Sequence, residues 1–443
     1  MLRTEVPDAE HFPEQVAADV LRGHLDLVSP ATAPELETHT GLRSTLAAVA
    51  LAQLEAEGFV IQGHFRDPDS VDVEWCSRRL LARMHSYSRK RRRSSVTSAS
   101  PQDFVRFLLR WQHLAPGTQL HGAGGLARVI EKLQGFHAAA AAWEPNLLAP
   151  RIGGYDPAWL DRFCHDGQVV WLRLGARATD DPDRRGSGPS KATPISVVFR
   201  DDLSWLLQAV RGDNPIAPPS VGATAEVVDV LRSRGARFLP ELAADTGRLR
   251  TDVETALWDG VARGLVTADG FESIRALVAG TRSNRRRERP LSRIRRGVGA
   301  SGQAAGRWQL IDDPAPVDDH HAFVEAVAEQ LLVRWGVVFY DLCAHENLAL
   351  PWRDLQWALR RFEDRGVVKG GRFVAGFSGE QFALPEAVDG LRATRKQPKN
   401  GERVRVNACD PCNITGVITH GERVPAVRTN TVTFVDGVPE PHG

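Results

Sequence analysis

The chain has 443 residues, enough for several domains of ordinary size. Its formal net charge of +1 argues against a protein that coats nucleic acid over its whole surface, and five cysteines in so long a chain do not make a disulfide framework. No apolar run approaches the roughly 20 residues that span a bilayer, and the first residues lack a signal-peptide core. We therefore expect a cytoplasmic protein that has no membrane contact.

Three segments of the chain align without gaps. Residues 40–65 align with residues 246–271, and the second half of this pattern aligns with residues 358–373. Each copy has apolar residues three and four apart, which is typical of a helix, and then a β-prone run that contains a tight turn. Between the helix and the β-prone run, each copy has a glycine suited to a left-handed C-cap. These glycines are Gly58, Gly264 and Gly366.

A shorter helix is predicted before each of the first two repeats. Thr32 and Glu35 form a capping-box pattern in the first copy, and Pro240 starts the helix in the second. Helix, turn, helix and hairpin is the plan of a winged helix, whose second helix normally enters the major groove of DNA. The alternative is that the copies serve only as packing modules.

The pattern predicts a mainly α fold with small β elements, built from tandem winged-helix domains and a C-terminal β element that is barrel-like. Residues 1–75 form the first winged helix, and residues 76–200 form a helical connection and a divergent second one. The third covers residues 201–280, a basic flexible linker covers 281–306, and the fourth covers 307–395. Residues 396–443 show short alternating runs broken by Gly, Pro and Asn, which indicate strands.

Arginines are concentrated at several places in the chain. Residues 88–95 and 282–296 are dense basic segments that could contact phosphates, although a solvated linker is the plainer interpretation of both. Other arginines lie on or just before the expected recognition helices, where arginine suits phosphate contact. The candidate DNA-binding residues are Arg43, Arg91, Arg92, Arg248, Arg250, Arg353 and Arg360.

Several motifs in this order resemble one known family. They are "EWCSRRLLARMHSYS", "FLLRWQHLAPGTQLHGAGGLARVIEKLQGF", "AAWEPNLLAPRIGGYDPAWLDRFCHDGQVVWLRL", "AGRWQLI", "RGVVKGGRFVAGFSGEQFALPEAVDGLR" and "DPCNITGVITHGERVPAVRTNTVTFVDGVP". Together they resemble the C-terminal part of the Lhr (large helicase-related) family of DNA repair helicases. The resemblance implies tandem winged helices with a β-barrel element, and similarity to the AlkZ-type DNA glycosylases.

The chain departs from that family in one respect. A superfamily 2 helicase needs an ATPase motor, but no G-x-x-x-x-G-K-[ST] motif occurs, and the nearest fragment, "GSGPSKAT", has the wrong spacing. We therefore expect no cofactor in this chain, with ATP and Mg²⁺ confined to a separately encoded helicase core.

The glycosylase resemblance suggests catalytic candidates. Glycosylases flip a base out of the duplex and need a carboxylate to stabilise a cationic sugar. Where AlkZ-type enzymes carry Gln-x-Asp or Gln-x-Gln, this chain keeps Gln134 but has Phe136 at the third position. Nearby carboxylates are Asp156, which suits a helix cap equally well, and Asp161. Asp410 lies in another matching motif, where Asp also suits a tight turn.

Two other residue groups favour structural roles. Cys409 and Cys412 form one C-x-x-C pair, but structural zinc takes four ligands and no second pair exists, so no metal site is expected. The four tryptophans of the second unit could stack on an unpaired base, but their apolar neighbours favour core positions for at least three of them. These are Trp111, Trp143, Trp159 and Trp171.

These observations favour a DNA-binding module of an Lhr-type repair helicase that lacks its motor, with DNA and a separate helicase core as partners. A DNA glycosylase that excises a damaged base such as uracil is the alternative enzyme class. An architectural module that forms homo-oligomers is the third interpretation.

Overall fold

The computed structural model describes residues 13–28, 30–94, 98–175, 190–212, 216–283, 306–311, 316–347 and 350–440, without the side chains of residues 89–94 and 280–283. The chain divides into two compact units, residues 1–95 and residues 96–443. Among the described residues, no helix is both long and apolar enough to cross a membrane.

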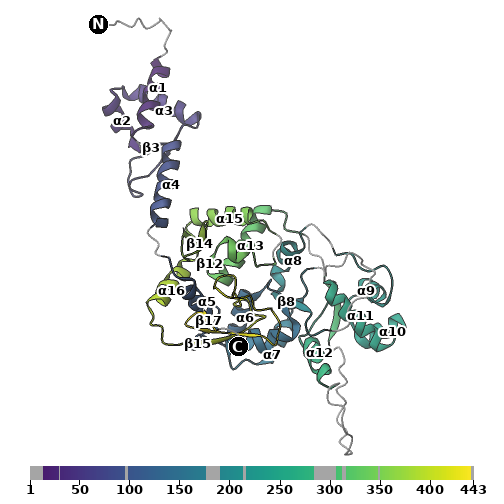
Figure 1. The fold of residues 1–443 in the computed structure, drawn as a ribbon. Helices are drawn as coiled ribbons and strands as arrows, with labels where there is room; N and C mark the ends of the chain where they lie inside the picture. Colours follow the sequence, from purple (N-terminus) through teal and green to yellow (C-terminus); the bar gives the residue numbers. More distant parts are fainter. Residues whose placement is uncertain are drawn as a thin grey trace, which may run out of the picture. The chain divides into compact units, whose positions relative to one another are not determined.

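The first unit is a complete winged helix followed by one long helix (Figure 1). The strand order β1-β3-β2 places the first strand beside the last, as a winged helix requires. The expected capping box is present, because the Thr32 hydroxyl accepts from the Glu35 N–H and the Glu35 carboxylate accepts from the Thr32 N–H. The elements are α1 (Pro13–Leu25), β1 (Ala31–Thr32), α2 (Ala33–Thr40), α3 (Ser44–Ala56), β2 (Val60–Gly63), β3 (Glu74–Ser77) and α4 (Arg78–Ser94).

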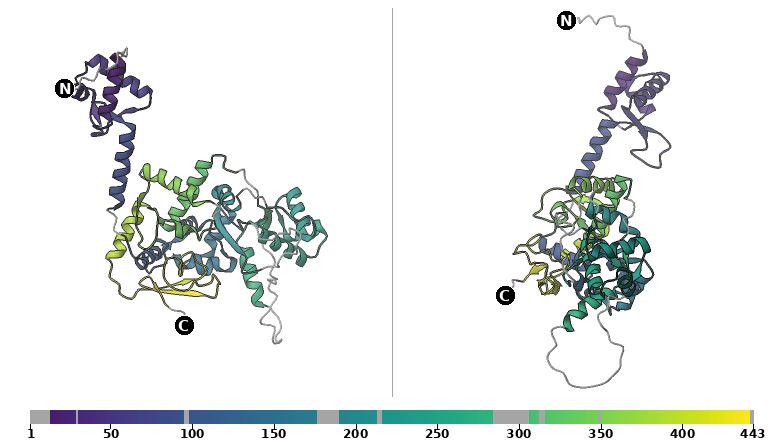
Figure 2. Two further views of the ribbon diagram at one scale, coloured as in Figure 1. Left: turned by 45° about the horizontal axis from the view of Figure 1, so that its top comes forward. Right: turned by 90° about the vertical axis from the view of Figure 1, so that its right-hand side faces the viewer.

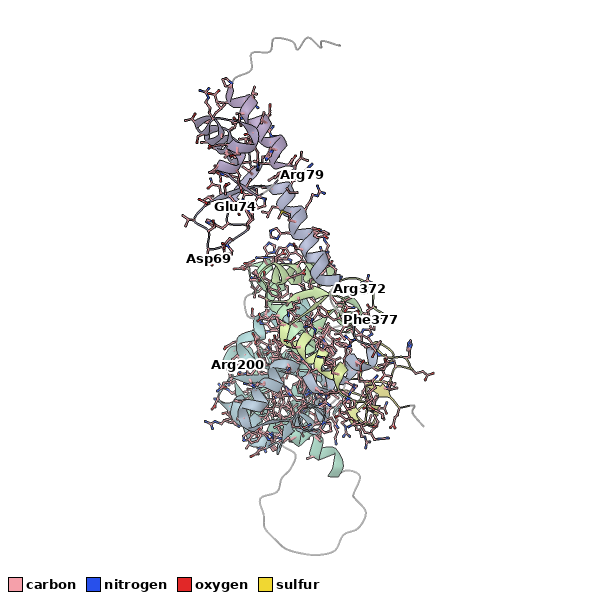
Figure 3. All side chains as sticks on the ribbon, turned by 90° about the vertical axis from the view of Figure 1, so that its left-hand side faces the viewer. Asp69, Glu74, Arg79, Arg200, Arg372 and Phe377 are labelled. Carbon is pink, nitrogen blue, oxygen red and sulfur yellow. The ribbon has the colours of Figure 1, made fainter. Side chains whose placement is uncertain are left out.

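The wing of this domain is the loop between β2 and β3. Figure 3 shows Asp69 near its tip and Glu74 at its base. Glu74 is buried and pairs with Arg66, which also pairs with Glu35 at 2.6 Å, so one arginine ties the wing to the start of α2. Because Arg66 donates hydrogen bonds to it, the pKa of Glu35 falls to about 2.

The second unit begins with a helix and a divergent winged helix. Its sheet has the order β5-β8-β7, the same arrangement as in the first unit. The helix between the first strand and the recognition helix is replaced here by short 3-10 and π-helical turns. The elements are α5 (Pro101–Trp111), β4 (Leu120–His121), α6 (Gly122–Leu133), β5 (Ala138–Ala139), η1 (Ala140–Ala142), η2 (Trp143–Leu148), η3 (Ala149–Arg151), β6 (Ile152–Gly153), α7 (Pro157–His165), β7 (Val169–Leu172) and β8 (Pro194–Phe199).

A third winged helix follows, with strand order β10-β11-β9. Its last strand comes from far along the chain, since Trp308 pairs with Ala268 on one side and Arg237 on the other. The elements are η4 (Arg200–Asp202), α8 (Leu203–Arg211), α9 (Ala223–Arg234), β9 (Arg237–Phe238), α10 (Leu239–Thr246), α11 (Arg250–Arg263), β10 (Val266–Ala268), α12 (Glu272–Ser283) and β11 (Arg307–Leu310).

A fourth winged helix and a C-terminal sheet complete the unit. The sheet order β12-β14-β13 repeats the pattern again. The final strands form an antiparallel sheet of order β15-β16-β17 (yellow in Figure 2). The elements are α13 (His320–Trp335), β12 (Val337–Val338), α14 (Tyr340–Cys343), α15 (Trp352–Asp364), β13 (Lys369–Gly371), β14 (Gln381–Ala383), α16 (Pro385–Lys396), β15 (Arg403–Asn407), β16 (Thr431–Val435) and β17 (Val438–Pro439).

The fold class is as predicted, but three details differ. The C-terminal strands form an open three-stranded sheet, so the barrel-like expectation is not supported in the described part of the chain. Residues 76 and 77, expected to begin the helical connection, belong to strand β3 (Glu74–Ser77) of the first winged helix. Residues 307–310, expected to open the fourth domain, instead form strand β11 and close the sheet of the third. Residues 284–305 of the expected basic linker lie outside the described residues.

The winged helices of the second unit pack directly on one another. Trp171 of β7, Trp258 of α11 and Trp308 of β11 form a buried aromatic cluster, with ring centroids 5.6–6.3 Å apart. On the other side, the buried Arg334 of α13 donates to the carbonyl oxygens of Lys132 and Gln134 at 3.1 and 2.5 Å. The second winged helix therefore lies between the third and the fourth.

Candidate nucleic-acid interface

The recognition helices differ in how much surface they leave open. In α11, nine of 14 residues are buried, whereas in α3 and α15 only four of 13 are. The second half of α11 packs on the second winged helix, and Trp258 is part of that contact. The third winged helix therefore uses its recognition helix for packing, while α3 and α15 keep an outward face.

The predicted arginines fall into two groups. Arg43, Arg250 and Arg353 are exposed at the starts of α3, α11 and α15, without an ion-pair partner among the described residues. Arg248 pairs with Glu226 at 2.6 Å, and Arg360 pairs with Glu380 at 2.7 Å. The side chains of Arg91 and Arg92 lie outside the described residues.

The exposed face of α15 carries more than arginine. Trp357 is 39% exposed, its ring stacks on His321 with centroids 4.4 Å apart, and the Arg361 guanidinium lies 4.7 Å from the ring centroid. Trp357 follows Arg353 by one helical turn, so both side chains belong to the same face. Sequence reasoning missed this tryptophan, although its spacing from Arg353 was a usable signal.

Helix α4 is a second basic surface in the first unit. It carries eight Arg and Lys residues and no Asp or Glu, and Figure 1 shows it continuing from β3 beyond the α1–α3 body. Of its described arginines, Arg79 lies 3.7 Å from Asp26, and its own side chain is 70% exposed. Sequence reasoning selected only the C-terminal cluster of this helix.

The four catalytic candidates are not brought together. Gln134 is buried between domains, where its amide donates to Asp202 and Gln330 at 2.9 Å each and accepts from the Phe199 N–H. Asp156 caps α7 by accepting from the Ala158 N–H.

The other two carboxylates are engaged in ion pairs. Asp161 pairs with Arg275 at 2.8 Å, and this arginine also binds Glu144. Asp410 forms a bidentate ion pair with the Arg151 guanidinium, with N–O distances of 2.6 and 2.9 Å, and both side chains are almost completely buried. Both carboxylates are therefore held by arginine side chains.

One cavity lies close to the glycosylase-like segment. Its volume is about 540 Å³, and its walls come from residues 136–139, from α13 and α14 of the fourth winged helix, and from the loop of residues 408–429. Phe136 and Asp410 line it, whereas Gln134 lines a different hollow, beside Asp202 and Gln330. Among the catalytic candidates, the structure therefore places Asp410 alone at this cavity.

The remaining sequence candidates occupy the core or its edge. Trp143 and Trp171 are fully buried, and Trp111 and Trp159 are partly buried against the two large apolar clusters. Cys409 and Cys412 are buried free thiols whose pKa values burial raises. Within the described residues, no group of three or more His, Cys, Asp or Glu side chains is placed to hold a metal ion.

The repeated sheet order, together with the open faces of α3 and α15, defines a tandem winged-helix protein. Two family models of the large helicase-related protein winged-helix domain match residues 99–185 and residues 317–403. These matches confirm the resemblance to the Lhr family.

Two relatives extend the similarity over most of the chain. An "Lhr helicase/ probable uracil glycosylase" of Mycolicibacterium smegmatis is 29% identical over 411 residues, which is 87% of this chain and 26% of the relative. An "Lhr helicase/uracil glycosylase" of Escherichia coli is 26% identical over 450 residues, which is 93% of this chain and 28% of the relative. The chain thus spans about a quarter of the length of each relative.

Proposed function

We propose that this chain is a DNA-binding module that corresponds to the C-terminal region of an Lhr-type repair helicase. The observation that carries the proposal is the difference between the recognition helices: α3 and α15 present exposed arginines on open faces, while α11 is largely packed. Helix α4 adds a dense line of positive charge that suits the phosphate backbone.

Binding of a fluorescent duplex measured against salt concentration tests this assignment. Replacing Arg43 or Arg353 by Ala should weaken binding and lower the salt slope by about 1 for each phosphate that the arginine neutralises. Arg392→Ala, at an exposed residue of α16 that pairs with Asp389, removes the same charge from a helix that is not a recognition helix and serves as the control. Equal affinity and slope in the chain and in the Arg43→Ala/Arg353→Ala variant would leave the winged helices as packing modules.

The ATPase activity is proposed to lie outside this chain. No phosphate-binding loop motif occurs in its sequence. The purified chain should therefore hydrolyse no ATP, with or without DNA. DNA-stimulated hydrolysis by homogeneous protein would contradict this proposal.

Base excision is the second candidate function. Both relatives have uracil glycosylase in their names, and this supports testing the chain on uracil-containing oligonucleotides for the appearance of abasic sites. Asp156→Asn, Asp161→Asn and Asp410→Asn, assayed separately, show which carboxylate the reaction needs. If the unmodified chain forms no abasic sites, the DNA-binding function stands without this activity.

A further inference from the structure

The cavity beside Phe136 has the size and lining of a small-molecule site. Its volume of about 540 Å³ lies within the roughly 300–1,000 Å³ of such sites. Its walls are largely apolar and include two aromatic rings, those of Phe136 and Trp335. Aromatic rings in a cavity wall favour a planar ligand, because a ring that stacks on them buries its face.

Two side chains in the wall keep unused hydrogen-bonding atoms. The Asn413 amide donates to the carbonyl oxygens of Ala408 and Val424, while its Oδ1 is buried and has no partner within the described part of the chain. The Nε2 of His137 is likewise buried and unpartnered there. A buried polar atom without a partner is destabilising, so a ligand with a polar edge gains a hydrogen bond here that an apolar ligand cannot make.

His137 is neutral at physiological pH. Burial, followed by the nearby positive charges of Arg173 and Arg334, lowers its pKa to about 4. Its Nδ1 lies 3.4 Å from the Asn347 amide nitrogen and accepts from it, so the neutral imidazole carries its proton on Nε2 and can donate there. His137 and Asn413 together therefore match the mixed donors and acceptors on the edge of a nucleobase.

The rim of the cavity is positively charged. Arg423 and Arg428 are exposed at the rim, and neither has an ion-pair partner among the described residues. The acidic side chains of the wall are already engaged, because Asp410 pairs with Arg151, and Glu346 accepts from Arg334 and Trp335. An anionic group on the ligand would therefore meet arginine at the rim and, in the described wall, no free carboxylate.

We propose that this cavity binds one nucleotide unit, with the base against its aromatic lining near Asn413 and His137 and the phosphate at Arg423 and Arg428. The nucleotide can be free in solution or everted from DNA. The DNA source rests on the proposed DNA-binding function, whereas the free nucleotide does not.

Two variants separate the base from the phosphate. Ala426 is exposed and lines the cavity, so Ala426→Trp fills the space without changing charge. Arg423→Ala/Arg428→Ala removes the rim charges and leaves the interior intact. Arg392→Ala/Arg405→Ala removes two exposed arginines elsewhere in the same unit and is the matched control.

Calorimetric titration with deoxynucleoside monophosphates measures the free ligand. We expect saturable binding of one nucleotide per chain, at least tenfold weaker in Ala426→Trp and in Arg423→Ala/Arg428→Ala, and unchanged in the control. Fluorescence anisotropy with a fully paired duplex and with a duplex that carries one unpaired nucleotide measures the everted form. Ala426→Trp should abolish the preference for the unpaired nucleotide and leave the affinity for the paired duplex unchanged.

The two measurements give distinguishable outcomes. If the chain binds free nucleotides but does not prefer the duplex with an unpaired nucleotide, the site takes a free nucleotide. If it prefers that duplex but does not bind free nucleotides, the site takes a nucleotide of DNA. If neither occurs, or if both cavity variants bind as the unmodified chain does, the proposal is wrong. Thermal melting by circular dichroism checks that each variant is folded, and the exposed Arg423→Ala/Arg428→Ala variant decides the question if Ala426→Trp is unstable. Loss of duplex binding alone would overturn the proposed DNA function and leave the nucleotide titration valid.

Discussion

Replacing Asp410 by Asn tests whether this carboxylate stabilises the fold. Arg151 lies on η3, and Asp410 lies after β15, so their ion pair joins the second winged helix to the C-terminal segment. Arg151 also donates to the Leu147 carbonyl oxygen, and Asp410 accepts from the Cys412 N–H, both at 2.9 Å. Burial alone would lower the pKa of Arg151, but the charge and hydrogen bonds of Asp410 raise it. The guanidinium therefore stays charged in the core.

The expected magnitude follows from that burial. The side chains of Arg151 and Asp410 are 1% and 0% exposed, so Asp410→Asn leaves a positive charge without compensation in a region that water does not reach. Removing one partner of such a pair costs about 3–5 kcal/mol. At about 2 °C per kcal/mol for a large unit, the Tm falls by about 6–10 °C.

Calorimetry and urea denaturation of the second unit's transition measure this loss. Asp389→Asn is the control, since Asp389 pairs with Arg392 on the surface at 3.5 Å, and it should cost less than about 1 kcal/mol. Arg151→Met/Asp410→Leu removes both charges and should recover much of the stability. A loss below about 1 kcal/mol in Asp410→Asn would refute the reasoning. Unchanged stability with lost base excision would instead assign Asp410 to catalysis.

Three further predictions concern other parts of the chain. Because the pKa of His137 falls from 6.5 to about 4 on folding, the unfolded chain takes up a proton below pH 6.5 that the folded chain does not, so the free energy of unfolding is highest above about pH 6.5 and falls by about 3 kcal/mol toward pH 4. In urea denaturation, this free energy should fall less steeply with pH in His137→Phe, and equal pH dependence in both proteins would contradict the prediction. Gly437→Ala should lower the Tm of the second unit, because Gly437 has a φ of +81° and an added Cβ would lie 2.1 Å from the Gln102 carbonyl oxygen; an unchanged Tm would show that this contact is not tight. Thr32→Ala should destabilise the first unit by about 1 kcal/mol through loss of its capping box, with no shift in the melting of the second unit; a matching shift in both transitions would show that the units unfold together.

Local signals in the sequence were sufficient for the helices and their ends. The Thr32–Glu35 capping box is present, and Pro240 lies in the first turn of α10. The three repeat glycines, Gly58, Gly264 and Gly366, have φ values of +74°, +78° and +78°, as left-handed C-caps require. These features depend on interactions within a few residues, so the repeat alone carried enough information to predict winged helices.

Local sequence signals did not predict which strands pair with the last strand of the first and third sheets. Strands β3 and β11 are four residues long, and each has a partner distant in sequence, β1 for β3 and β9 for β11. No local pattern therefore separates β3 from the following helix or β11 from the next domain. For this reason strand β11 was predicted to belong to the fourth domain and not to the third. Distant pairing depends on the shape of the assembled domain, and a short strand contributes little local preference of its own.

The sequence alone therefore determined the class of domain, the helix ends and the family resemblance, because these depend on local capping, apolar periodicity and ordered motifs. Tertiary structure decided the environment of each polar side chain. Gln134 and Asp410 looked like catalytic candidates, but the fold buries both among partners contributed by other domains. The fold also brings Phe136, Asn413 and Arg428 to one cavity across nearly 300 residues of chain. The physical reason is that burial and charge compensation arise only when separate domains pack together.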